Sequence, residues 1–290
     1  MTVQEIHEEE NASISTLCSI ARIPRSAFYK WLKREIPDNE RLNESLSEAI
    51  KIIHEESPDM GYRRIRDKIV RDYCIEVSDN RILRICRTLG IKSTIKYKNE
   101  GCTVSEKNPQ HIAENILNRN FKADKPNEKW LTDVTEFKYY VGDEKRKVYL
   151  SAILDLYDRR IVAYVIGDSN NNPLVFDTFD KAVELNPDAR PIFHSDRGFQ
   201  YTNQIFYEKL VKQGMTQSMS RVGKCIDNGP MEGFWGILKR ERYYKRKFES
   251  RQELVQMIDD YIKYYNTKRY QRRLGILTPM EKHCRYLIAA

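Results

Sequence analysis

The sequence lacks a clustered set of cysteines or histidines. Its six cysteines form no C-x-x-C pair, and its five histidines are dispersed along the chain. A disulfide framework or a zinc module requires such residues at short, characteristic spacings. The pattern therefore predicts free thiols, and no zinc module can be recognised in the sequence.

Long apolar runs, internal repeats and low-complexity tracts are also missing. No stretch approaches the roughly 18 to 20 uninterrupted apolar residues of a membrane span. The first ten residues, MTVQEIHEEE, carry acids where a secretory signal carries bases. With 40% apolar residues among 290, the chain can bury one substantial core and one or two small modules. We expect a cytoplasmic protein of two or three domains without membrane contact.

The net charge of +8 is concentrated in the last quarter of the chain. Residues 221–290 hold 16 bases and 8 acids, whereas the rest of the chain is nearly balanced. Aromatic residues are interleaved with these bases in RERYYKRKF and YIKYYNTKRYQRR. Such a segment is typical of a surface that follows nucleic-acid phosphates. A solvated basic helix face is the alternative interpretation.

The first third of the chain is helical in pattern and begins with a predicted helix-turn-helix. Two short helices are expected over residues 14–21 and 26–34, separated by the turn at 22–25. The second helix of such a unit can enter the major groove of DNA. The side chains that would then face DNA are Ser26, Tyr29, Lys30 and Lys33. An ordinary corner of a helical bundle has the same pattern.

A second helical unit follows, with helices predicted over residues 40–56, 61–72 and 78–89. Its middle helix carries Arg63, Arg64 and Lys68 around apolar residues. This pattern suits DNA contact and a charged bundle surface equally. The polar stretch 96–127 then predicts a linker with one short helix near residues 111–117.

After residue 127 the pattern changes to strands. Strands are predicted over residues 130–140, 148–157, 160–166 and 191–196. Helices are predicted over residues 173–185, 203–213 and 229–245. This order is that of ribonuclease H-like folds. The expected fold class is therefore α/β: a ribonuclease H-like core with a mixed five-stranded sheet flanked by helices, after an all-α N-terminal DNA-binding region.

Three acids fall on separate elements of this predicted core. Asp133 lies inside the apolar strand WLTDVTEF, Asp196 ends the strand PIFHSD, and Glu232 lies in the first turns of a helix. That helix has Pro230 near its start and Asn228 or Asp227 as its predicted cap. Taken singly, each acid has a structural explanation, such as a strand hydrogen bond, a turn cap or a favourable helix dipole.

Taken together, the three acids predict a metal site. Carboxylates gathered without a cation repel one another and take up protons, whereas Mg²⁺ relieves the repulsion. Two such ions, for which Mn²⁺ can substitute, activate an attacking oxygen and stabilise a leaving one. Asp133, Asp196 and Glu232 are thus the expected catalytic and metal-binding residues of phosphodiester chemistry.

Two longer motifs surround the second and third acids. They read H-S-D-R-G-x-Q-Y over residues 194–201 and S-M-S-R-x-G-x-C-x-D-N-G-P-M-E over residues 218–232. With WLTD, GYRRI and YYNTKRYQRRLGILTP, they make residues 45–285 resemble the integrase-core transposases of bacterial insertion sequences. The resemblance is to the second-frame (OrfB) product of the insertion-sequence-three family, which has a retroviral-integrase-like (DDE) core.

The spacing of the acids agrees with the family pattern. There are 35 residues between Asp196 and Glu232, and Lys239 follows seven residues after Glu232. Seven residues is nearly two helical turns, so Lys239 shares a face with Glu232 and is expected to contact a DNA phosphate. Further expected DNA contacts are Arg197, Arg240 and Arg242.

Some residues depart from the family pattern or leave alternatives open. Phe199, Gly233 and Trp235 replace residues that are more usual in the family, but none of them removes a ligand. Asp155 competes with Asp133 for the role of first aspartate, because it is also an acid within a predicted strand. Accessory roles in the site are open to His194 and Asn228.

The resemblance implies a DNA transposase that cleaves the 3′ ends of an insertion sequence and joins them to target DNA. A nuclease of the same fold and a catalytically silent DNA-binding regulator are the alternatives. The implied partners are element ends, target DNA, further copies of the chain on DNA and, by fusion or association, an upstream-frame product. The predicted domains are a helix-turn-helix-like segment (1–38), a helical DNA-binding region (39–99), a linker (100–125), the catalytic core (126–246) and a basic helical tail (247–290).

Overall fold

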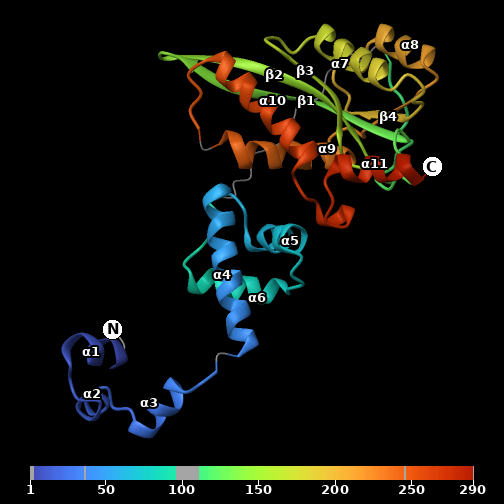
Figure 1. The fold of residues 1–290 in the computed structure, drawn as a ribbon. Helices are drawn as coiled ribbons and strands as arrows, with labels where there is room; N and C mark the ends of the chain where they lie inside the picture. Colours follow the sequence, from blue (N-terminus) through green and yellow to red (C-terminus); the bar gives the residue numbers. More distant parts are fainter. Residues whose placement is uncertain (1–2, 36, 96–110, 245, 290) are drawn as a thin grey trace.

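The computed structural model describes residues 3–35, 37–95, 111–244 and 246–289. Three short helices come first: α1 (Val3–Glu10), α2 (Ile14–Ile20) and α3 (Arg25–Leu32). They lie apart from the rest of the molecule in Figure 1. The helices predicted over residues 14–21 and 26–34 are present as α2 and α3, whereas the pattern did not predict α1.

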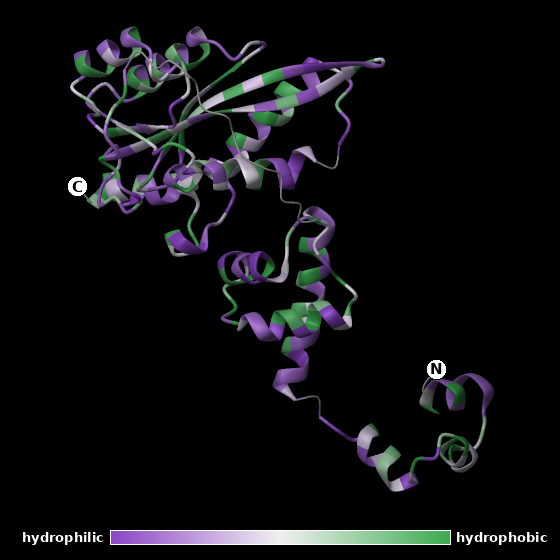
Figure 2. Cartoon of the chain, turned by 180° about the vertical axis from the view of Figure 1, so that it is seen from behind, coloured by the Kyte–Doolittle hydropathy of each residue, from purple (hydrophilic) through white to green (hydrophobic). Residues whose placement is uncertain are grey.

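The next helices form a unit with its own apolar core. They are α4 (Asp38–Glu56), α5 (Tyr62–Asp72) and α6 (Asp79–Thr88). The green, apolar residues of α4 and α6 meet where the two helices cross in Figure 2. The side chains that are fully shielded from solvent there include Leu46, Ile50, Ile53, Ile69 and Ile82. The start of α6 is fixed by Ser78, whose hydroxyl accepts a hydrogen bond from the amide of Arg81.

The core contains a five-stranded mixed sheet in the order β3-β2-β1-β4-β5. The strands are β1 (Lys129–Val141), β2 (Glu144–Asp155), β3 (Ile161–Gly167), β4 (Ile192–Ser195) and β5 (Thr216–Met219). The first three strands pair antiparallel, and β4 and β5 join them in parallel register. The expected fold class is confirmed, although β5 was not among the predicted strands.

Helices cover both faces of the sheet. On one face, α7 (Asn172–Leu185) and α8 (Gln204–Lys212) enclose an apolar cluster around Trp130, Phe179 and Phe206. On the other, α9 (Gly229–Leu238) and α10 (Arg251–Thr267) enclose a cluster around Leu131 and Phe234. The last helix, α11 (Pro279–Ala289), packs beside α10. Much of the predicted basic tail is therefore part of the layered core.

Two predicted helices differ from the structure. Residues 111–117 are not helical, because their backbone pairs with the core instead: the amide of His111 donates to Thr202 O and that of Leu117 to Ser218 Oγ. The helix predicted over residues 229–245 ends its α-helical part at Leu238 and continues as a π-helix, Lys239–Tyr243. Among the described residues, no helix is long and apolar enough to cross a membrane.

Ion pairs connect the α4–α6 unit with the core and the C-terminal segment. Arg64 Nη1 lies 2.9 Å from Glu241 Oε1, and Arg272 contacts Asp67 at 2.7 Å and Asp79 at 2.9 Å. Arg272 belongs to the C-terminal basic segment, so part of the charge expected to face phosphate is paired within the chain. Arg64, a predicted DNA contact, is also engaged in this interface.

Candidate active site

Two adjacent parallel strands bring Asp133 and Asp196 together. Leu131 of β1 is paired with His194 of β4; Asp133 follows two residues later on β1, and Asp196 directly follows Ser195, the last residue of β4. Side chains two residues apart on a strand point to the same face. Asp133 therefore lies on the face of Leu131, which α9 covers, and close enough to Asp196 for the charge of Asp196 to act on it. Although 62 positions separate them in the sequence, the parallel register makes them neighbours.

The carboxylate of Asp133 is held by two hydrogen bonds. Its Oδ1 accepts from the amide of Val134 at 2.8 Å, and its Oδ2 accepts from the indole Nε1 of Trp235 at 3.0 Å. Trp235 lies on α9, three residues after Glu232, and is buried. The indole thus connects the strand that carries the first acid with the helix that carries the third. In the sequence, Trp235 stands out only as a departure from the family pattern.

The surroundings of Asp133 and Asp196 disfavour the charged forms of these acids. Burial raises the pKa of Asp133 to about 8, and the charges of Asp196 and Glu232 add to the shift. Burial also raises the pKa of Asp196, whose Oδ1 accepts a hydrogen bond from the amide of Gly198 at 2.9 Å. Both carboxylates would be stabilised in their charged form by a nearby cation.

The donor chemistry of the site is that of carboxylate oxygen. Glu232 lies in the first turn of α9, and its side chain is exposed, whereas Asp133 and Asp196 are partly shielded by the sheet. In the part of the chain that the structure describes, no three acidic, histidine or cysteine side chains form a ready-made metal cluster. Two neighbouring aspartates with a glutamate nearby nevertheless fit a hard divalent cation, which prefers oxygen ligands.

A second layer of polar groups stands behind Asp133. Asn228 Nδ2 donates to the carbonyl of Thr132 at 2.9 Å, and the Thr132 hydroxyl lies 3.2 Å from that of Tyr201. Asn228 thereby anchors the start of α9 to β1 beside the first acid. It is the N-cap residue, but its side chain makes no capping hydrogen bond. The predicted side-chain cap is therefore wrong, because Asn228 is used for this tertiary contact.

Asp227, the other predicted cap, also has a different role. Its carboxylate accepts hydrogen bonds from Arg221 at 2.8 Å and Arg119 at 2.6 Å. These arginines hold the pKa of Asp227 well below its usual range. Asp227 therefore secures the loop before α9 instead of capping the helix.

Asp155 lies away from the paired aspartates, at the end of β2. Its carboxylate accepts hydrogen bonds from the amides of Asn127 at 2.6 Å and Tyr157 at 2.7 Å. Burial and the charge of Asp158 raise its pKa to about 6. Asp155 therefore closes the turn after β2. The acid that lies close to Asp196 is Asp133.

His194 is a buried residue of β4. Its Nδ1 lies 2.9 Å from the Ser218 hydroxyl and its Nε2 lies 3.1 Å from that of Ser220. Burial lowers the pKa of His194 to about 4, so the ring is neutral at physiological pH. The ring connects β4 with the β5 region, and an accessory catalytic role for it stays a prediction.

His194→Gln is expected to flatten the acid dependence of stability. The neutral ring is favoured in the fold, so its contribution is complete above the unfolded pKa of 6.5 and is lost as the pH falls towards 4. Urea unfolding should show that wild-type stability falls more steeply between pH 6.5 and 4 than that of the variant. Parallel pH curves for the two proteins would contradict this assignment.

The predicted DNA contacts occupy several environments. Lys30 and Lys33 are exposed at α3, whereas Arg242 pairs with Asp59 and Arg197 Nε donates to Ser220 O. The ammonium group of Lys239 lies 5.1 Å from the centre of the Phe137 ring. Arg240 is half-buried, and Arg63 lies over the Tyr62 ring. Contact of these side chains with DNA stays a prediction.

Trp235→Phe is expected to weaken the site without unfolding the protein. The change keeps the buried ring but removes the donor to Asp133, and one such hydrogen bond corresponds to about a three- to tenfold effect. We expect the Mg²⁺ concentration for half-maximal activity to rise by that factor.

Trp130→Phe provides a matched control for this measurement. It removes another buried indole, whose Nε1 donates to Asn127 Oδ1 at 3.2 Å, away from the acids. This variant should lose stability but keep the wild-type Mg²⁺ requirement. An unchanged requirement in Trp235→Phe would show that Trp235 does not position Asp133.

Three family profiles match the chain. The profile of the integrase core domain matches residues 123–225, and a second integrase core profile matches residues 232–283. The profile of an HTH-like domain matches residues 41–99. The two integrase core profiles together cover the sheet, most of α9 and all of α10. The HTH-like profile covers nearly all of the α4–α6 unit.

Curated relatives are similar over nearly their whole lengths. The putative transposase InsK for insertion sequence element IS150 of Escherichia coli (strain K12) is 36% identical over 92% of both chains. The insertion element IS600 31 kDa protein of Shigella sonnei is 34% identical and covers 91% of this chain and 96% of its own length. The transposase InsF for insertion sequence IS3A of E. coli is 27% identical over 95% of both chains.

Among solved structures, the HTLV-2 integrase catalytic core domain in complex with magnesium is similar to 56% of this chain and 99% of its own. The identity is 19% and the TM-score is 0.43. The sequence matches, by contrast, extend over the helical unit and the core together. They show that the chain belongs to the insertion-sequence-three family of transposases, with an HTH-like domain and an integrase-type catalytic core.

Proposed function

We propose that Asp133, Asp196 and Glu232 catalyse 3′-end cleavage of an insertion sequence and its transfer to target DNA. The observation that carries this proposal is that Asp133 on β1 lies close to Asp196, directly after the neighbouring strand β4, and that the charges of Asp196 and Glu232 both act on Asp133. Burial and like charge make this arrangement unfavourable on its own. The cost is explained if the three acids serve to hold cations.

We propose Mg²⁺ as the natural cation, held as two ions by the three acids, with Mn²⁺ able to substitute. When bound, the ions would supply charge that activates an attacking oxygen and stabilises a leaving one. The chain itself orients the ligands, because the amide of Val134 and the indole of Trp235 fix the Asp133 carboxylate. The amide of Gly198 does the same for Asp196.

DNA would be held by separate surfaces of the chain. Lys30 and Lys33 on α3 are exposed and suit groove or phosphate contact, while Lys239 and Arg240 follow α9 towards the DNA that lies at the acids. Joining two element ends to one target requires two active sites, so we infer that copies of the chain act together on DNA. Fusion or association with an upstream-frame product is a further proposal.

We also propose that residues 1–38 and 39–99 bind DNA and that residues 126–246 form the catalytic core. The segment 247–290 would then have two roles. Its α10 residues complete the core, and its remaining basic side chains contribute to DNA binding.

The test uses purified full-length protein with linear DNA that carries the terminal repeats flanking its coding region. With Mg²⁺, we expect nicked products and joined products longer than the substrate on denaturing gels. Nicked products alone would favour a nuclease that cleaves without joining. Binding of the repeats without Mg²⁺-dependent cleavage would favour the silent DNA-binding regulator.

A further inference from the structure

A large cavity lies on the side of α9 that faces away from the catalytic acids. It has a volume of about 940 Å³ and is lined by α5, the end of β2, α9 and the segment after α10. On α9, Gly229, Gly233 and Ile237 line it at intervals of four residues. Trp235, which donates to Asp133, lies two residues after Gly233 and therefore on the opposite side of the helix. The cavity is therefore separate from the proposed metal site.

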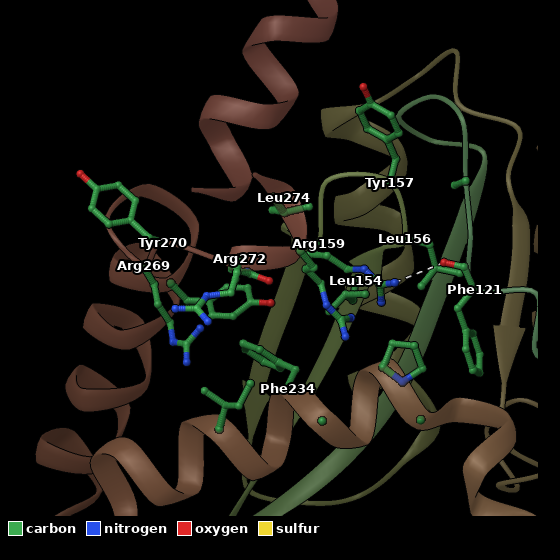
Figure 3. Close-up of a pocket in the computed structure, with 18 of the residues that line it drawn as sticks. Phe121, Leu154, Leu156, Tyr157, Arg159, Phe234, Arg269, Tyr270, Arg272 and Leu274 are labelled. Atoms are coloured by element: carbon green, nitrogen blue, oxygen red, sulfur yellow. Dashed lines mark hydrogen bonds between the residues drawn. The ribbon is translucent and has the colours of Figure 1, made fainter. Parts of the chain in front are cut away.

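Several arginines point into this space, as Figure 3 shows for Arg159, Arg269 and Arg272. Two of these have acidic partners within the chain. Arg269 pairs with Glu241 at 2.8 Å, and Arg272 pairs with Asp67 at 2.7 Å. These guanidinium groups on the α5 side of the cavity are thus neutralised internally.

Arg159 and Arg273, which also line the cavity, differ from these arginines. Within the described residues, neither side chain forms an ion pair with a carboxylate. Arg159 Nη2 donates to the carbonyl of Phe121 at 3.2 Å, while its Nη1 is buried without a hydrogen-bond partner. Burial and the charge of Arg273 lower the pKa of Arg159 to about 10. The Nη1 group of Arg159 is thus a buried donor without an acceptor, within reach of the charge of Arg273, and an anion held between the two guanidinium groups would satisfy it.

The wall of the cavity next to these bases is apolar and includes aromatic rings. The accessible apolar lining comes from Phe121, Pro230, Ile237 and Leu274, which are partly exposed, whereas Phe234, Leu154 and Leu156 are buried. Figure 3 shows Phe121 and Phe234 on either side of Arg159. Rings and aliphatic side chains of this kind suit the flat face of a nucleobase. The combination of a flat apolar wall and two guanidinium groups matches the two halves of a nucleotide, its base and its phosphate.

We propose that this cavity is a second, non-catalytic site that binds one nucleotide unit. Arg159 and Arg273 hold the phosphate, and Phe121 with the partly exposed apolar side chains near it contacts the base. The unit comes either from an unpaired position of a DNA strand or from a free nucleotide, since both present the same chemistry. The site goes beyond the proposed chemistry at Asp133, Asp196 and Glu232, because it uses none of these acids.

The test is calorimetric titration of the full-length protein with deoxyadenosine monophosphate in EDTA. Without divalent cations the catalytic acids contribute no affinity for the phosphate. Deoxyadenosine and inorganic phosphate, titrated separately, test the two halves of the ligand. We expect the nucleotide to bind at least about tenfold more tightly than either half.

Three variants test the cavity itself. Arg273→Ala removes an exposed arginine that holds no carboxylate, and Arg159→Lys keeps the charge but removes the fork; each should weaken binding about tenfold. Gly233→Leu should abolish binding, because a Cβ there meets nothing within 4 Å and the larger side chain would enter the cavity. Leucine also favours the helix more than glycine does.

Arg285→Ala is the matched control, because Arg285 is an exposed arginine of α11 outside the cavity. It should bind the nucleotide as the wild type does. The proposal is overturned if the wild type does not bind the nucleotide, if the three cavity variants bind normally, or if Arg285→Ala weakens binding as much as Arg273→Ala.

A five-nucleotide single strand identifies the source of the ligand. If it binds more tightly than the mononucleotide and Gly233→Leu removes that difference, the site holds a nucleotide of a strand. If the mononucleotide binds as tightly or more tightly, and Gly233→Leu abolishes its binding, the site holds a free nucleotide.

Discussion

Asp196→Asn and Glu232→Gln should each reduce cleavage and joining of terminal-repeat DNA by more than about 100-fold, since even residues behind a metal ligand account for about 10- to 100-fold. Both changes are nearly isosteric and remove only the charge and the metal affinity of one carboxylate. The measurement is the initial rate of product formation on gels at saturating Mg²⁺. Asp133→Asn should have the same effect, because Asp133 on β1 lies close to Asp196, directly after β4.

The unfolding free energy of the same variants shows whether they are correctly folded. Because burial raises the pKa of Asp196, neutralising it should leave the unfolding free energy of the metal-free protein unchanged or higher. Asp188→Asn and Glu208→Gln alter exposed acids of the core and should keep wild-type rates. Wild-type rates in Asp196→Asn or Glu232→Gln would remove that residue from the mechanism.

Asp155→Asn distinguishes the two candidates for the first aspartate. Asp155 accepts hydrogen bonds from two backbone amides in the turn after β2, and asparagine keeps only one acceptor oxygen; this loss is opposed by the removal of a buried charge whose pKa is raised, so the unfolding free energy should change little. Activity measured per folded molecule should also stay close to that of the wild type. A catalytic loss as large as that of Asp133→Asn would reverse the assignment.

Glu241→Ala should lower the free energy of unfolding by about 3 to 5 kcal/mol, the range for removing one partner of a buried ion pair. Only 4% of the Glu241 side chain is exposed, and its carboxylate accepts hydrogen bonds from Arg64 at 2.9 Å, Arg269 at 2.8 Å and Tyr261 at 3.0 Å. Burial by itself would raise the pKa of Glu241, but Arg269 and Arg64 outweigh it and hold the pKa below its usual range. The variant leaves Arg269 without its acid, whereas Arg64 keeps its ion pair with Asp59 at 3.1 Å.

The measurement for Glu241→Ala is urea unfolding followed by tryptophan fluorescence. Glu144→Ala serves as the control, because it breaks an ion pair with Arg146 whose side chains are 73% and 55% exposed. Exposed pairs contribute about 0 to 1 kcal/mol, so this variant should stay close to the wild type. Equal stability losses in the two variants would mean that the buried network does not hold the α4–α6 unit against the core.

Local sequence patterns identified most of the elements of this protein. The amphipathic stretches of α4, α5 and α6, the strands β1 to β4 and the acids Asp133, Asp196 and Glu232 follow from short-range periodicity, turn residues and motif spacing. These signals are local because each residue pattern reflects the one face of a helix or strand that is buried.

Some local signals were misleading because tertiary contacts replaced them. Three of the four residues of β5 are polar, and they form a strand because β4 supplies a parallel partner. Residues 111–117 carry a helical pattern, but they are extended because Thr202 and Ser218 satisfy their amides. Asn228 has the chemistry of a cap but binds Thr132 instead.

The sequence by itself singled out the three acids that we propose carry the chemistry, since their motifs and the 35-residue spacing are written in the chain. Only the tertiary structure decided what surrounds them. The parallel pairing of β1 with β4 brought Asp133 close to Asp196, Asp155 lies at the end of β2, and the docking of α9 brought Trp235 to the first acid from 102 positions away. Contacts between distant residues depend on how strands pair and helices dock, and no local pattern records that.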